Sequence, residues 1–455
     1  MQYILHIFPF FISCYIGWAI IGLILHKYKI SSLMHLCLGM GLGLGINGET
    51  TFISFLLLKQ FNQYFVIIFN TAIAIILAGL QLYKRQSKQK QNHIEYKGIL
   101  KNKKEIIEFV ILFTILIPLL YIQNIHYPYG GWDAWSVWNL KARFLFLAKD
   151  NWQDIFSPIL WRSSPHYPIL LPLINVWGWS LLSQPSNITP AITATIFTFI
   201  SMGLLFSMLK PHTNLILLYL TIIAIITNPL FLKLASSQYC DIVLGYYLLA
   251  TISCLIMAKQ TKETPFCFLT GLFTGILSFT KPEGLISAGI LFLLYIPYLV
   301  YQNKRHIIYA KKITFKFIAG LSITSIIPAI FYIIYAPTNI TFENKILSMP
   351  LLEILFRIRA IFYSYFMNLI NINQWHGLLL FLFILLIAHQ KKASDRYIII
   401  IPIYLMIYMG IISFYYFINT YFEINWWLNV TLDRIIFALL PTITLWILYS
   451  TKERT

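Results

Sequence analysis

The sequence predicts an all-α polytopic membrane protein with about 13 transmembrane helices. Three observations support this fold class. First, 58% of the 455 residues are hydrophobic and 11% are charged, whereas soluble domains carry about a quarter charged residues. Second, the mean hydropathy of the chain is +0.72. Third, apolar stretches of about 20 residues recur along the chain, and this length crosses a bilayer.

The polar segments between these stretches are too short for a separate soluble domain, so we expect a single transmembrane domain over residues 1–455. It divides into N-terminal helices with a basic loop (1–105), a central core (106–300) and C-terminal helices (301–455). The predicted spans are 4–24, 33–58, 64–83, 106–124, 188–209, 213–232, 241–258, 266–281, 284–301, 317–335, 375–388, 397–417 and 434–450.

Two further apolar segments do not fit a spanning topology. If 169–182 crossed the bilayer, the basic loops on its two sides would face opposite compartments. Its two tryptophans suit the membrane interface. We therefore expect an interfacial helix on the outer surface, within the first outer loop. The same reasoning places 350–369 along the outer face.

The basic residues set the orientation of the predicted helices. Most of the 34 Lys and Arg residues fall in loops that this topology places on one side, above all in 84–104. By the positive-inside rule that side is cytoplasmic, which puts the N-terminus outside and the C-terminus inside. The net charge of +18 therefore reports topology, and we expect no nucleic-acid partner. The five cysteines are scattered without a CxxC pair, so neither a disulfide framework nor a zinc site is predicted.

Chemistry-bearing side chains from distant parts of the chain gather on the predicted outer face. Charged groups beside lipid are costly and usually pair or function. Each also has a structural interpretation: an acid can cap a helix, a surface ion pair contributes little, and tryptophans form interfacial belts. Both interpretations remain open for the residues in question, which are Asp133, His166, Asp241, Lys281, Glu283 and Arg434, with Trp132 and Trp135 beside the first acid.

The order of these motifs resembles a known family. An acid follows an early helix, and "HYPILLPL" comes some 30 residues later. "NPLFLKLASSQYCDIVLGYYLLA" and "GLFTGILSFTKPEGLI" follow, with a weaker echo in "DRIIFALLPTI" near the end. The pattern over about 106–300 is similar to the GT-C superfamily of membrane glycosyltransferases. That superfamily includes protein O-mannosyltransferases, aminoarabinose transferases and oligosaccharyltransferases. The chain differs from many members in having a single acid at Asp133 and three helices before it.

The resemblance implies a hexosyltransferase-type enzyme of cell-envelope glycan biosynthesis that takes a sugar from a polyprenyl-phosphate donor. It places the site on the outer face of the cytoplasmic membrane. Asp133 would be the catalytic acid of the first outer loop, and Asp241 a second acid. Lys281, Arg434 and His166 are the candidates for the donor phosphate. The acceptor would be a glycan, a lipid or a protein.

The chemistry of transfer suits these residue types. A carboxylate takes the acceptor proton, and cations stabilise the leaving phosphate. We expect direct, inverting displacement with Asp133 as general base. Trp132, Trp135 and Glu283 would contact sugar or acceptor. Asp241 would orient the acceptor or bind a divalent metal, although no cofactor is predicted with certainty.

Two other classes remain open. A transporter or flippase would place ionisable residues within its spans, and Glu49 is the candidate there. A polymerase or ligase of lipid-linked oligosaccharides would use arginines of a long outer loop, for which Arg357 and Arg359 are available.

Overall fold

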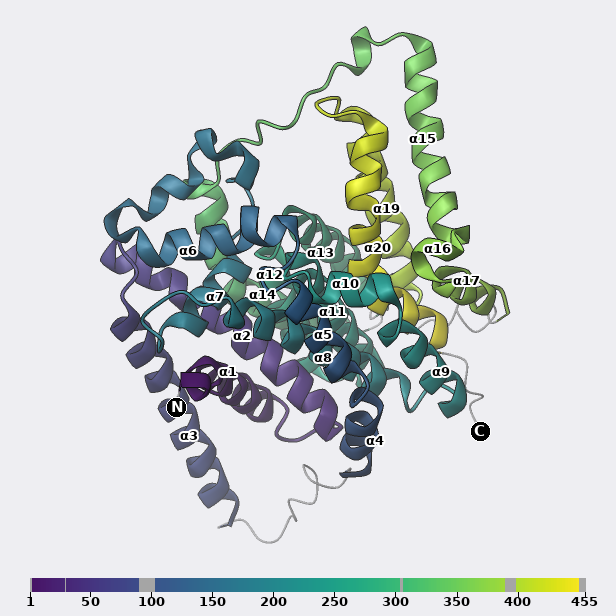
Figure 1. The fold of residues 1–455 in the computed structure, drawn as a ribbon. Coiled ribbons are helices and arrows are strands. Elements are labelled where there is room, and N and C mark those ends of the chain that lie inside the picture. Colours follow the sequence, from purple (N-terminus) through teal and green to yellow (C-terminus); the bar gives the residue numbers. More distant parts are fainter. Residues whose placement is uncertain (1, 29, 90–102, 303–305, 389–397, 450–455) are drawn as a thin grey trace.

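The computed structural model describes residues 2–28, 30–89, 103–302, 306–388 and 398–449, and in this part of the chain all regular secondary structure is helical (Figure 1). Among the described residues, ten helices are long and apolar enough to cross a membrane. They are α1 (Gln2–Ile24), α2 (Ser32–Leu58), α3 (Gln63–Gln89), α4 and α5 together (Lys103–Phe113, Leu116–His126), α8 (Ile188–Leu209), α11 (Cys240–Thr261), α13 (Pro282–Gln302), α14 with η4 (Ile307–Ile330, Phe331–Tyr335), α19 (Ile400–Ile418) and α20 (Ile424–Leu448). The all-α, multi-pass architecture expected from the sequence is confirmed.

The predicted count of 13 spans is not confirmed, because three of the predicted segments are not among these ten helices. Segment 213–232 forms two helices, α9 (Leu215–Ile226) and α10 (Pro229–Ser236), bent by 62°, which raise the number of spans to 11 if counted as one. Segments 266–281 and 375–388 form the shorter helices α12 (Thr264–Ser278) and α17 (Leu378–Ala388). At 1.5 Å per residue both are shorter than the roughly 30 Å hydrocarbon core.

The last helix begins well before the predicted position. α20 starts at Ile424 rather than near 434, so Arg434 lies within the helix. Asn429 and Asp433 interrupt the apolar pattern of this stretch without breaking the helix, because both side chains face a cavity. Polar residues that line a cavity therefore made a continuous helix look like a loop.

Segment 169–182 does not lie on the surface. Its helix α7 (Leu170–Trp179) has all ten residues buried against α1, α2, α6 (Asn139–Leu147) and α8. Trp177 Nε1 donates to Pro9 O and to Ser13 Oγ, 3.1 and 3.0 Å away. The expected interfacial helix is therefore wrong at this position, since its tryptophans bond inside the protein.

The remaining elements connect the long helices. Between α5 and α8 lie η1 (Ala134–Trp138), α6, η2 (Lys149–Phe156), η3 (Pro158–Ser163) and α7. Between η4 and α17 lie η5 (Ile346–Ser348), α15 (Leu351–Ile370) and α16 (Ile372–Trp375). α15, in the region predicted to be interfacial, packs beside α19 and α20 and rises with α19 at one end of the molecule (Figure 1). Most of the predicted cytoplasmic loop 84–104 lies outside the described residues.

Helix packing brings the site together at one end of the bundle. α11 is the most deeply buried span and contacts α8, α12 and α20. Its first turn lies beside the α12–α13 connection, because Cys240 Sγ donates to Thr280 O at 3.1 Å. α20 packs along α11. Side chains from these separate elements therefore converge where α11 begins.

Candidate functional site

A pair of glycines brings the first long loop, which follows α5 and carries Asp133, against the start of α11. Gly130 has φ +71°, a conformation that favours glycine. A Cβ at Gly131 would lie 2.2 Å from Tyr239 Oη. The Gly131 N–H donates to Ser237 O at 3.0 Å. Only glycine permits this approach, which places Asp133 beside the residues that precede α11.

A buried network of amides reinforces the same junction. Asn139 Nδ2 donates to Gln238 Oε1 at 2.8 Å, and Asn175 Nδ2 donates to Asn139 Oδ1 at 3.2 Å. Thr193 Oγ1 donates to Asn175 Oδ1 at 2.9 Å and completes the network. Buried networks whose members are satisfied rigidify their surroundings. The network therefore ties α6, α7, α8 and the turn before α11 together.

Arg434 is the centre of the charged cluster. Its Nη1 donates to Asp133 Oδ2 at 2.7 Å, while its Nη2 and Nε donate to Asp241 Oδ2 at 2.9 and 3.1 Å. The guanidinium also lies over the ring of Tyr239, 4.4 Å from its centroid. The two acids, 108 positions apart in the sequence, thus share one guanidinium.

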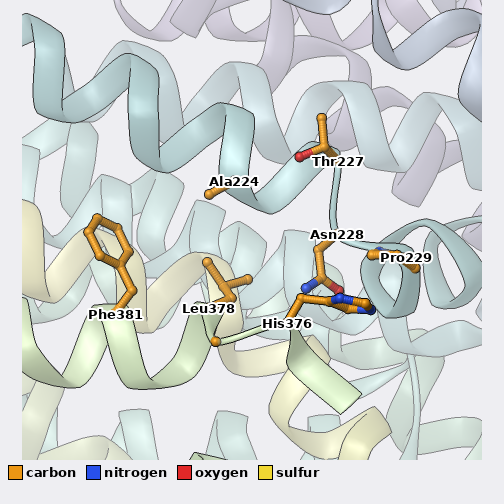
Figure 2. Close-up of a pocket in the computed structure, with 8 residues that line it drawn as sticks. Ala224, Thr227, Asn228, Pro229, His376, Leu378 and Phe381 are labelled. Atoms are coloured by element: carbon orange, nitrogen blue, oxygen red, sulfur yellow. The ribbon is translucent and has the colours of Figure 1, made fainter. Parts of the chain in front are cut away.

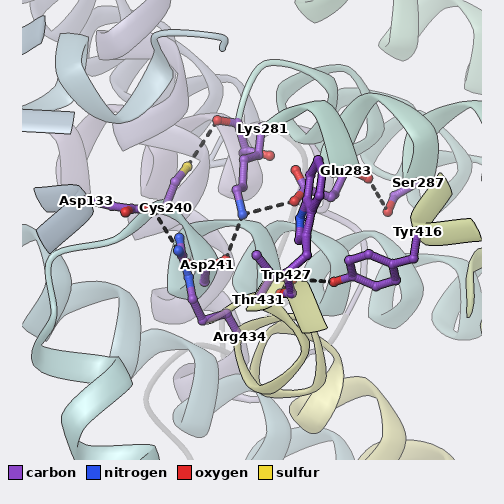
Figure 3. Close-up of polar contacts among 11 residues, drawn as sticks. Asp133, Cys240, Asp241, Lys281, Glu283, Ser287, Tyr416, Trp427, Thr431 and Arg434 are labelled. Atoms are coloured by element: carbon purple, nitrogen blue, oxygen red, sulfur yellow. Dashed lines mark hydrogen bonds and ion pairs between the residues drawn. The ribbon is translucent and has the colours of Figure 1, made fainter. Parts of the chain in front are cut away.

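Lys281 extends the cluster to a third acid. Lys281 Nζ lies 3.0 Å from Asp241 Oδ1 and 3.0 Å from Glu283 Oε1 (Figure 3). Burial acts to lower the pKa of Lys281, but the two carboxylates outweigh it and hold this pKa above the ordinary value. Asp133, Arg434, Asp241, Lys281 and Glu283 form one continuous chain of ion pairs, which we call the charged cluster. Its three acids and two bases give a formal charge of −1.

The helix-capping interpretation of the acids is wrong for the side chains concerned. Asp133 precedes η1, yet its carboxylate makes no capping hydrogen bond and bonds to Arg434 instead. Asp241 lies in the first turn of α11 and bonds to Arg434 and Lys281. Asp433 lies in the middle of α20 and accepts from Gln374 Nε2. η1 itself is a π-helix, a form that often marks functional sites.

A cavity of about 1590 Å³ opens over the charged cluster. Its walls come from the first long loop, η3, α10, α13, α19 and α20. The predicted residues that line it are Trp132, Asp133, Trp135, His166, Lys281, Glu283 and Arg434. Asp241 does not line the cavity, and its side chain is 2% exposed. Seven of the eight predicted site residues therefore face one space, with the eighth behind them.

The two candidate tryptophans form an exposed pair at the cavity. The Trp132 and Trp135 rings pack edge to face, with centroids 4.4 Å apart. Further along the cavity, Phe422 packs against Trp426 and Trp427. Sugar rings stack on such faces through their C–H groups while apolar chains pack against them, so the lining suits an amphipathic ligand.

Lys141 is hydrogen-bonded to the backbone of the loop that carries His166. Lys141 Nζ donates to Ser164 O and Tyr167 O, 2.7 and 3.1 Å away. Burial lowers the pKa of Lys141 to about 7. Burial and the Lys141 charge lower the pKa of His166 to about 4. His166 is therefore neutral at physiological pH and has no charge with which to attract an anion.

The sequence did not single out Lys141, Tyr239 or Lys233, all of which belong to the site region. Burial, together with the Asp133 charge, raises the pKa of Tyr239, and Arg434 opposes the shift. Lys233 on α10 lines the cavity and is exposed to it. The signal in the sequence for Lys233 was the break "TNP" before α10, where an Asn cap and a Pro at the first helical position start a new helix.

The cluster does not fit a divalent metal. Both oxygens of Asp241 are held by cations, and Asp133 faces the Arg434 guanidinium. Within the described residues no three His, Cys, Asp or Glu side chains form a metal-binding group. The carboxylates of the cluster therefore pair with cationic side chains, and the expected alternative role of Asp241 as a metal ligand has no support in its contacts.

The residues that favoured a transporter or a polymerase lie outside the cavity. Arg357 is buried and donates to the carbonyls of Tyr416, Phe417 and Asn419 at the end of α19, so it fixes α15 to α19. Glu49 is buried in α2, and its Oε1 has no hydrogen-bond partner in the described part of the chain. Neither lines the cavity.

No family model, no curated protein and no solved structure matches the chain. The function is therefore inferred from the geometry of the site.

Proposed function

We propose that the protein is a glycosyltransferase that moves a sugar from a polyprenyl-phosphate donor to a glycan, lipid or protein acceptor. The observation that carries this proposal is the position of Asp133. It faces a large cavity that has aromatic and apolar walls, and one of its oxygens is bonded to Arg434. The other, Oδ1, makes no hydrogen bond to a described residue, so it is available to a ligand.

Asp133 is the general base of this reaction. The acceptor hydroxyl or amine attacks the anomeric carbon, and Asp133 Oδ1 takes the proton that it loses. The bond between the anomeric carbon and the phosphate oxygen breaks, and its electron pair leaves with the polyprenyl phosphate. Direct displacement inverts the anomeric configuration. A cationic side chain exposed to the cavity, such as Lys233, stabilises the charge that develops on the phosphate.

Asp241 has a positioning role. Both of its oxygens are engaged by Lys281 and Arg434, and it is enclosed by protein. It holds Arg434 in the orientation in which Nη1 reaches Asp133. Trp132 and Trp135 hold the sugar and exclude water, and Glu283 anchors Lys281 at the other end of the cluster.

The location follows from the donor and from the charges of the loops. A lipid-linked donor keeps its chain in the bilayer, so the cavity lies at a membrane interface. When the bent α9–α10 pair and the short helices α12 and α17 are each counted as a crossing, the positive-inside rule puts that interface on the outer face of the cytoplasmic membrane, with the N-terminus outside and the C-terminus inside.

Donor turnover by the purified protein tests the function. The wild type is offered a panel of polyprenyl-phosphate sugars with candidate acceptors, and released polyprenyl phosphate and the product anomer are measured. Asp133→Asn lowers turnover by about 10²- to 10⁴-fold, whereas Asp150→Asn, at an exposed acid of the same outer loop away from the cavity, retains it. Equal turnover by the two variants rules out the assignment of the base.

One observation favours a transporter as the second candidate. Glu49, whose Oε1 has no hydrogen-bond partner among the described residues, lies within a predicted span, where ionisable residues are usually functional. Proteoliposomes that move a lipid-linked sugar across the bilayer, with loss on Glu49→Gln and no chemical turnover, would support this class instead.

A further inference from the structure

The cations predicted to bind phosphate are already neutralised. Arg434 uses Nη1, Nη2 and Nε on carboxylates, and Lys281 contacts two carboxylates. Their side chains are 15% and 7% exposed. With its formal charge of −1, the charged cluster alone repels an incoming phosphate. An anionic donor needs a further cation in the cavity.

In the described part of the chain, two other cations line the cavity, Lys233 and Arg162. Neither forms an ion pair with another described residue. Arg162 lies over the ring of its neighbour Trp161, 5.3 Å from the centroid, on η3. Lys233 is on α10, which packs against α20, and it lines the same cavity as Asp433 and Arg434 of that helix. Of these two cations, Lys233 is the one on a helix that packs against the helix of Arg434.

α10 also separates the large cavity from a smaller one. The smaller cavity, of about 410 Å³, lies at the break between α9 and α10, and Ala224, Leu378 and Phe381 give it an apolar wall (Figure 2). Pro229 lines the smaller cavity and Leu230 the larger one. The two spaces therefore meet the same turn of α10.

The break is a built feature of the chain. Asn228 Oδ1 accepts from the Phe231 N–H at 3.0 Å and starts α10, while Asn228 Nδ2 donates to Trp375 O at 2.7 Å. These bonds fix α10 against the α16–α17 turn. α9 before the break is apolar apart from Tyr219 and Thr221, and its Ile216 and Leu220 are exposed as lipid-facing residues are.

We propose that the polyprenyl-phosphate donor binds across α10, with its phosphate on Lys233 and the first units of its chain in the cavity at the α9–α10 break. This inference rests on the proposed function for the identity of the ligand. Lys233 donates to the phosphate oxygens, and the apolar wall between α9 and α17 receives the chain on its way to the bilayer. The sugar is then placed over Arg434 and Asp133.

Equilibrium binding of polyprenyl phosphate to the purified full-length protein tests the phosphate position without turnover. Lys233→Gln is expected to weaken binding roughly 10- to 100-fold, the effect of losing one charge-assisted contact. Lys233→Arg retains most of the affinity. Lys149→Gln, an exposed lysine away from the cavity, binds as the wild type does. Binding of the uncharged polyprenol is unchanged by Lys233→Gln.

The chain position has its own variant. Ala224→Trp fills the smaller cavity and weakens binding of the long-chain phosphate, but not of a phosphate that carries a single isoprene unit. Unchanged binding of the long-chain phosphate by Ala224→Trp overturns this part of the inference.

Three results overturn the phosphate assignment: a wild type that does not bind polyprenyl phosphate, Lys233→Gln that binds it as the wild type does, and Arg162→Gln that loses more affinity than Lys233→Gln. Failure of the proposed function is distinguishable, because polyprenyl phosphate then binds through Lys233 but no donor is turned over.

Discussion

Asp133 and Asp241 share Arg434, but their surroundings differ. The side chain of Asp133 is 27% exposed, has one bonded oxygen and faces the cavity. The side chain of Asp241 is 2% exposed and has cations on both oxygens. The same residue type thus serves two purposes. The enclosed acid fixes the cations, and the accessible acid has an oxygen left for a ligand.

The largest effect is expected at the enclosed acid. Asp241→Asn leaves Lys281 and Arg434 buried without their main counter-charge, and breaking a buried pair in this way costs about 3–5 kcal/mol. We expect a large fall in the thermal midpoint of the protein in detergent, with loss of donor turnover. A midpoint equal to that of Asp150→Asn would show that Asp241 is not an anchor.

Asp133→Asn is expected to separate activity from stability. Removal of a general base lowers kcat by about 10²- to 10⁴-fold. Loss of the partly exposed ion pair between Asp133 and Arg434 lowers the stability by up to about 1 kcal/mol. Single-turnover kinetics and thermal unfolding of the same preparation measure both effects.

Glu283→Gln is the matched comparison for Asp133→Asn. Glu283 also lines the cavity, and its Oε2 has no partner among the described residues. If kcat falls further on Glu283→Gln than on Asp133→Asn, the base is Glu283. The acid to compare with the enclosed Asp241 is then Glu283 and not Asp133.

The close approach of the first long loop to α11 allows the position of Asp133 to be changed without changing its side chain. In Gly131→Ala the new Cβ would lie 2.2 Å from Tyr239 Oη. The loop must then shift, and Asp133 moves relative to Arg434. We expect roughly a tenfold loss of kcat. Gly289→Ala is the control, because a Cβ there has no atom within 4 Å and alanine favours a helix.

The sequence predicted which residue types gather at one end of the bundle, but not their partners. Asp133, Lys281 and Arg434 could be assigned to one membrane face from the positions of the apolar spans and the basic loops. That Arg434 donates to both acids depends on how α11 packs on α20, two helices that lie far apart in the sequence. Its donors therefore looked free for a phosphate until the structure showed them engaged.

Two other signals were ambiguous in the sequence for physical reasons. Tryptophans at a membrane interface and tryptophans bonded inside a protein have the same one-letter pattern, which misplaced Trp177 and Trp179. Lys233 stands alone in the apolar segment "LFLKLAS", where nothing distinguishes a cavity residue from one that extends its amine to water. The Asn-Pro break just before it was the available signal.

Lys141 tests how the loop beside Asp133 is held, through the pH dependence of stability. Burial lowers its folded pKa to about 7, against about 10.4 in an unfolded chain. Between these values the unfolded state binds more protons, so stability rises as the pH rises from about 7 to about 10.4, by at most about 1.4 kcal/mol per pH unit. Below pH 7 both states are protonated and the full penalty remains. Lys141→Met removes this contribution, and thermal midpoints of both proteins from pH 6 to pH 9 measure it. Parallel curves would mean that Lys141 stays charged, and that its bonds to the Ser164 and Tyr167 carbonyls hold an ammonium rather than a neutral amine.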